Sequence, residues 1–83
     1  MYKVVLTNKA RKQLTKLDKQ NQIRISKLLE RAKIRPESHF KRLVASQYYS
    51  LRSGNYRIIA RIKKDVLIIL VLEIGHRKNI YSK

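Results

Sequence analysis

Cysteine is absent from this 83-residue sequence, and glycine, proline and acidic residues are scarce. Without cysteine the chain can form neither a disulfide framework nor a thiolate metal site. No metal-ligand spacing links the two histidines, His39 and His76, and the carboxylates are scattered. The acidic residues are Asp18, Glu30, Glu37, Asp65 and Glu73. We therefore expect no metal and no other cofactor, because two-metal chemistry requires clustered carboxylates.

Long hydrophobic runs are also missing. The longest one, residues 66–72, is far shorter than the roughly 20 residues that a membrane-spanning helix needs. The N-terminus lacks the apolar segment of a signal peptide. We expect a cytoplasmic protein with no membrane association, and its length predicts a single domain over residues 1–83.

The charge of the chain is strongly unbalanced. Twenty-one lysines and arginines face five acidic residues, which gives a net charge of +16. Self-repulsion of this size weakens the compact state unless an anionic partner is bound. Either a nucleic acid or an acidic protein would fit, whereas a basic surface that serves only solubility is the simpler alternative.

The N-terminal half has the pattern of one strand and two helices. Residues 2–6 read as a short strand, and Thr7 is a suitable N-cap for a helix with apolar positions at Ala10, Leu14 and Leu17. A second apolar stripe predicts a helix over residues 19–33, which Pro36 prevents from continuing. Residues 37–45 have no clear period and are expected to form a connection.

The C-terminal half alternates with the period of strands. Residues 46–52 and 56–63 should pair as a hairpin around the turn at residues 53–55. A short turn at residues 63–65 leads to the apolar strand 66–72, which should be covered on both faces and end before Gly75. We predict an α+β fold of order β-α-α-β-β-β, with two N-terminal helices packed on one face of a four-stranded, mainly antiparallel sheet.

Strand parity places several basic side chains on the sheet face away from the helices. Arg57 and Arg61 lie about 13 Å apart on one strand, and Arg52 shares their face on the paired strand, beside Tyr48. Guanidinium groups bind phosphate bidentately, so this face is a candidate phosphate or RNA site. The alternative is a solvated face whose charges serve only solubility.

The tail after the last strand adds His76, Arg77 and Tyr81. Cleavage of RNA by its own 2′-hydroxyl needs a base, cations for the phosphorane and an acid for the departing oxygen. A histidine suits proton transfer near neutral pH, and a tyrosine can do so if cations lower its pKa. Tyr81 could instead stack on a base or pack against the sheet, and His76 could be an ordinary surface histidine.

Two motifs resemble those of the RelE/ParE toxins. The run Leu51-Arg52-Ser53-Gly54-Asn55-Tyr56-Arg57 is similar to their L-R-x-G-x-Y-R hairpin. The run Gly75-His76-Arg77-Lys78-Asn79-Ile80-Tyr81 is similar to their closing G-H/K-R-x-x-x-Y tail. Together with the opening strand and the two basic helices, the resemblance covers essentially the whole chain.

This resemblance implies a fold related to microbial ribonucleases and a RelE-type toxin that cuts mRNA in the ribosomal A site, leaving a 2′,3′-cyclic phosphate. It also implies an acidic RelB-like antitoxin and a toxin–antitoxin hetero-oligomer. By motif position, Arg57 would stabilise the phosphorane, Arg77 would assist the leaving group and Tyr81 would orient the nucleotide. Arg52 would position phosphate, with Lys78 as a further RNA contact in the tail.

One departure from the RelE pattern concerns the general base. Tyr48 and Ser50 stand where RelE proteins carry lysines that are thought to help the base step, so His76 is the remaining candidate. ParE-type members share the fold but inhibit DNA gyrase without ribonuclease activity. A gyrase inhibitor and a non-catalytic RNA-binding module are therefore the alternatives to the ribonuclease.

Overall fold

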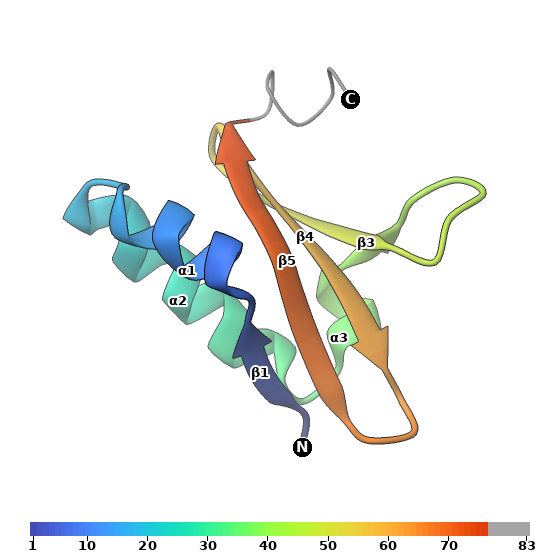
Figure 1. Ribbon diagram of the computed structural model, residues 1–83. Helices are drawn as coiled ribbons and strands as arrows, with labels where there is room; N and C mark the ends of the chain where they lie inside the picture. Colours follow the sequence, from blue (N-terminus) through green and yellow to red (C-terminus); the bar gives the residue numbers. More distant parts are fainter. Residues whose placement is uncertain (77–83) are drawn as a thin grey trace.

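The computed structural model describes residues 1–76, in which three helices and five strands follow one another in a mixed order (Figure 1). Figure 1 shows α1 and α2 lying together on one side of the sheet. The elements are β1 Lys3–Leu6, α1 Asn8–Thr15, α2 Lys19–Ala32, α3 Pro36–His39, β2 Lys41–Arg42, β3 Tyr49–Ser53, β4 Tyr56–Lys63 and β5 Ile68–His76.

The strands form one sheet in the order β1-β5-β4-β3-β2. Neighbouring strands run antiparallel except β1, which is parallel to β5. The predicted α+β class, with helices on one face of a mainly antiparallel sheet, is confirmed. None of the helices within residues 1–76 has the length and apolar character that a bilayer crossing requires.

The segment expected to be a connection contains two short elements instead. Pro36 begins the four-residue helix α3, because its fixed φ angle suits the first helical position. The two-residue strand β2 then pairs with β3, which makes the sheet five-stranded rather than four-stranded. Elements of two and four residues are too short to leave a hydrophobic period in the sequence.

The bounds of the last strand were also predicted wrongly. Val66 and Leu67 belong to the turn, and Leu67 has a left-handed φ of 54°. The strand starts at Ile68 and continues through Gly75 to His76. Its position between β1 and β4 confirms that the strand is internal in the sheet.

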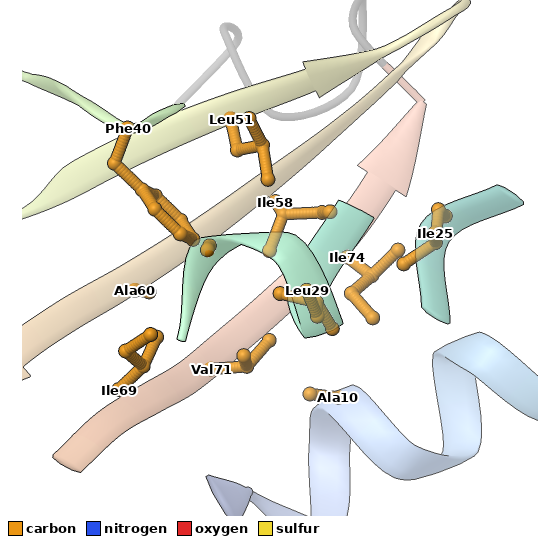
Figure 2. Packing of buried hydrophobic residues seen from close by; sticks show 11 residues of the cluster. Ala10, Ile25, Leu29, Phe40, Leu51, Ile58, Ala60, Ile69, Val71 and Ile74 are labelled. Carbon is orange, nitrogen blue, oxygen red and sulfur yellow. The ribbon is translucent and has the colours of Figure 1, made fainter. Parts of the chain in front are cut away.

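The core lies between the helices and one face of the sheet (Figure 2). Ile25 and Leu29 of α2 face Ile58 of β4 and Ile74 of β5, and all four are buried. Ala10 is also fully buried, and its small side chain allows α1 to approach the sheet closely. The predicted inward parity of β4 is confirmed by the burial of Ile58 and Ala60.

A β-bulge interrupts the pairing of β4 with β5. Ile59 lies opposite Glu73 and Ala60 lies opposite Val71, so Leu72 is the additional residue on β5. The sequence analysis did not predict this bulge, because residues 66–72, which lead up to it, are apolar at both parities.

The backbone of β5 near the bulge is tied to α1. Thr7 is the predicted N-cap: its Oγ1 accepts a hydrogen bond from the backbone N of Ala10 at 3.1 Å. The same hydroxyl donates to the carbonyl of Leu72 at 3.1 Å. The side-chain oxygen of Gln13 accepts from the backbone N of Ile74 at 2.7 Å.

Thr7→Ala is expected to lower the free energy of unfolding by about 1 to 2 kcal/mol, because it removes both the cap and the bond to Leu72. Urea denaturation measures this change. Thr15→Ala is the matched control, since the Thr15 hydroxyl is exposed and bonds only within its own helix. Equal losses in the two variants would contradict the role given to Thr7.

Candidate functional site

The face of the sheet opposite α1 and α2 carries the predicted arginines. In the register of β3 with β4, Arg52 pairs directly with Arg57 and Ser50 pairs with Ile59. The predicted common face of Arg52 and Arg57 is therefore confirmed. Arg52 is exposed, whereas Arg57 is only 7% exposed.

Arg57 lies in a groove of about 470 Å³ that also borders the segment from α3 to the loop after β2. Five of its lining side chains are basic or imidazole, and none is acidic. The lining residues are His39, Lys41, Arg42, Leu43, Val44, Ser50, Leu51, Arg52 and Arg57. A guanidinium keeps its charge when it is withdrawn from water, so a phosphate that enters this groove would meet a strong local positive potential.

His39, Lys41 and Arg42 were not among the predicted site residues. They surround Phe40, which is buried in the core at 3% exposure. A single aromatic residue in a basic segment indicates that the segment is anchored to the core there. That signal would have placed its basic neighbours beside the sheet.

Arg61 and Tyr48 lie outside the groove. Arg61 has the parity of Arg57 but lies opposite Leu70, towards the other end of β4. Tyr48 precedes β3, and its carbonyl accepts a hydrogen bond from the backbone N of Leu43 at 2.9 Å. The structure therefore brings together Arg52 and Arg57, and it separates Arg61 and Tyr48 from them.

His76 lies on the face opposite to Arg57. It pairs across the strands with Tyr56, and their rings make an edge contact with centroids 5.8 Å apart. Arg57 is paired instead with Gly75. Strand β5 ends at His76, and the predicted residues Arg77, Lys78 and Tyr81 lie outside the described residues.

Three lysines outside the groove are paired with carboxylates. Lys9 lies 3.6 Å from Glu73, and Lys33 lies 2.7 Å from Glu30. The Lys64 ammonium contacts the Glu37 carboxylate at 2.9 Å; this hydrogen bond lowers the pKa of Glu37 and raises the pKa of Lys64. Within residues 1–76, no three acidic, histidine or cysteine side chains gather where they could hold a metal ion.

The sequence matches the family model of the ParE toxin of type II toxin–antitoxin systems, parDE, over residues 4–81. No curated protein matches the chain by sequence.

Solved structures with the same fold include toxins named RelE and a toxin named YoeB/ParE. The toxin–antitoxin complex RelBE2 from Mycobacterium tuberculosis matches with a TM-score of 0.81 and 26% identity, covering 92% of this chain and 98% of that chain. The intact RelBE complex from E. coli matches with a TM-score of 0.78 and 22% identity, over 92% and 96% of the two chains. The YoeB/ParE toxin from Agrobacterium tumefaciens matches with a TM-score of 0.77 and 19% identity, covering 89% of this chain and 96% of that chain.

The family match extends over nearly the entire chain, and the fold is that of RelE toxins. The protein therefore belongs to the RelE/ParE superfamily of type II toxin–antitoxin toxins.

Proposed function

We propose that the protein is a ribosome-dependent endoribonuclease that cleaves mRNA in the A site and thereby inhibits translation. The observation that carries this proposal is the pairing of Arg52 with the deeply placed Arg57 in a groove without acidic side chains. Such a groove can hold a phosphodiester and stabilise additional negative charge on it. The RelE-like fold of the chain supports the same reaction class.

In the proposed reaction the 2′-hydroxyl of one nucleotide attacks the adjacent phosphorus. The P–O2′ bond forms, the P–O5′ bond breaks, and the products are a 2′,3′-cyclic phosphate and a free 5′-hydroxyl. A base accepts the proton of the 2′-hydroxyl, and an acid donates a proton to the leaving 5′-oxygen. The hydroxyl, the phosphate and the two proton-transfer groups account for every bond, so the reaction needs no metal.

Arg57 would stabilise the phosphorane, because among the arginines of residues 1–76 it has the least access to water. Arg52, exposed beside it, would hold the incoming phosphate. Arg77 would assist the leaving group and Tyr81 would orient the nucleotide, as the sequence motif implies, with Lys78 as a further RNA contact.

The geometry favours His39 over His76 as the proton acceptor. His39 lines the same groove as Arg57, whereas His76 pairs with Tyr56 on the other face of the sheet. Ser50, at 7% exposure on the floor of the groove, offers no amine for this step. A histidine also has an ordinary pKa near that required of a base at neutral pH.

An acidic RelB-like antitoxin would neutralise the toxin in a cytoplasmic hetero-oligomer. The net charge of +16 calls for an anionic partner, and the structural relatives from M. tuberculosis and E. coli were solved as toxin–antitoxin complexes. The ribosome and mRNA would be the partners of the free toxin.

Inhibition of DNA gyrase is the second candidate function, because the family model that matches the chain is that of ParE toxins. The absence of lysines at Tyr48 and Ser50 agrees with this alternative. A non-catalytic RNA-binding module remains the third, since the basic groove alone would suffice for it.

Arg57→Ala is expected to lower the rate of mRNA cleavage on programmed ribosomes about 100- to 1,000-fold, with a much smaller loss of RNA affinity. Primer extension measures the cut sites and their rate of appearance. Arg57→Lys keeps the charge but not the bidentate geometry, and it should also be strongly impaired. Arg11→Ala removes one exposed positive charge from α1 and is the control. Intact mRNA with the unaltered protein, together with weaker RNA binding and a smaller salt slope in Arg57→Ala, would instead support a non-catalytic binding module.

His39→Gln should lower the cleavage rate about 100-fold or more and remove the ionisation of the proton acceptor from the pH–rate profile. His76→Gln, the matched control, should leave that profile unchanged. If the ionisation disappeared only in the His76 variant, the proton acceptor would be the residue expected from the sequence. If it persisted in both, neither histidine would be the base.

Purified protein is expected to leave DNA supercoiling by gyrase unaffected at concentrations that cut ribosome-bound mRNA. A supercoiling assay with and without the toxin tests this directly. Inhibition of gyrase together with intact mRNA would replace the ribonuclease by the ParE-type activity.

A further inference from the structure

A second basic cavity lies on the helix side of the β3–β4 hairpin. Its volume is about 270 Å³, and no acidic side chain lines it. The lining residues are Arg24, Lys27, Leu28 and Arg31 of α2, with Arg52, Ser53 and Gly54 of the hairpin. Arg24, Lys27 and Arg31 are spaced by three and four positions, so they lie on one side of α2.

These cations have no counterion in the part of the chain that the structure describes. The ion pairs there use Lys9, Lys33 and Lys64. Glu30, the acidic residue next to Arg31, contacts Lys33 instead. Like charges at such spacings destabilise a helix, so an anion bound among them would relieve a cost that the free protein bears.

Ser53 supplies an independent indication of a ligand. Its side chain is 3% exposed, and its Oγ is buried without a hydrogen-bond partner among residues 1–76. Buried hydroxyls are nearly always hydrogen-bonded, because water satisfies them in the unfolded chain. Ser53 lines the cavity, so its hydroxyl can donate to an anion there.

One of these cations lies against the hairpin turn. Gly54 has a left-handed φ of 60°, and the Arg24 Nη1 atom lies 3.5 Å from the position that a Cβ on Gly54 would take. The guanidinium of Arg24 is therefore packed over the turn directly after Ser53. A donor placed in advance loses less conformational entropy when its ligand binds.

Arg52 lines both this cavity and the groove that contains Arg57. The two basic sites thus meet at Arg52 on β3. We propose that the cavity is a second phosphate subsite, occupied by a neighbouring phosphodiester of the same RNA strand that lies in the groove. This inference rests on the proposed function to the extent that the groove binds RNA.

RNA fits the two sites better than an acidic polypeptide does. A nucleic acid strand presents one phosphate per nucleotide, so it can fill two linked cation clusters without an intervening apolar contact. Arginine binds the two free oxygens of a phosphodiester in a fork, and a buried hydroxyl adds a directional donor. An acidic peptide at this cavity is the competing outcome of the test.

The test measures binding of fluorescein-labelled, 2′-O-methylated RNA of two and nine nucleotides by fluorescence anisotropy across a salt series. The methylated RNA cannot be cleaved by 2′-hydroxyl attack. For the nine-nucleotide RNA, the triple variant R24Q/K27Q/R31Q should reduce the slope of log affinity against log salt by about 0.7, from one lost phosphate contact. The dinucleotide has a single phosphodiester, which the groove holds, so its binding should respond much less.

The charge-matched control is R11Q/K12Q/K16Q, which changes two exposed residues of α1 and the exposed residue that caps its C-terminus. Equal reductions in slope for the two triple variants would overturn the subsite in favour of diffuse electrostatics. Polyglutamate is the second probe. If the α2 variant weakened polyglutamate binding more than RNA binding, the cavity would be a site for an acidic protein and the proposal would fail.

Ser53→Ala provides a variant without any change in charge. It should weaken binding of the nine-nucleotide RNA about tenfold while leaving the thermal unfolding temperature unchanged or higher, because the free protein loses only an unsatisfied hydroxyl. Unchanged affinity would overturn the role of Ser53.

The cleavage assay on ribosomes separates this proposal from the proposed function. RNA binding that depends on the α2 cations, together with intact mRNA, would reject the nuclease and keep the subsite. Cleavage of mRNA, together with RNA binding that does not depend on the α2 cations, would keep the nuclease and reject the subsite.

Discussion

The side chain of Thr7 joins the start of α1 to the irregular point of the central strand. Its hydroxyl oxygen accepts a hydrogen bond from the backbone N–H of Ala10, and its hydroxyl proton is donated to the carbonyl oxygen of Leu72. The backbone N of Thr7 also donates to the carbonyl of Val71 at 3.0 Å. Because β1 ends at Leu6, this edge of β5 would otherwise expose unpaired backbone groups next to the core. Helix α1 completes the hydrogen bonding of the sheet where its neighbouring strand stops.

The bulge that these bonds support decides which side chains of β5 reach each face. Before Leu72 the odd-numbered positions point inward, as the buried Val71 shows. After Leu72 the even-numbered positions point inward. Ile74 therefore enters the core, and His76 lies on the same face of the sheet as Tyr56. Regular pairing would have turned His76 towards the face of Arg57. One additional residue thus separates His76 from the groove that contains Arg57.

The hairpin half of the site was predictable because the turn at residues 53–55 fixes how β3 and β4 pair, so that parity put Arg52 and Arg57 on one face. The groove wall was not predictable, because the segment after Pro36 has no hydrophobic period and is held by a single buried aromatic residue. The bulge escaped prediction for another reason: residues 66–72, which lead up to it, are apolar at both parities and mark no register. The tail residues Arg77, Lys78 and Tyr81 stay predictions from the motif.

The two walls of the groove differ in how firmly they are held. Arg57 stands on a strand whose inward side chains form the core, so the backbone hydrogen bonds of β4 should open only when the whole domain unfolds. The opposite wall pairs through two residues of β2 and ends in a loop where Val44 is 95% exposed. Its backbone amides should therefore exchange with solvent far sooner than those of β4. The groove thus has one wall fixed by the core of the domain and one wall held by a two-residue strand.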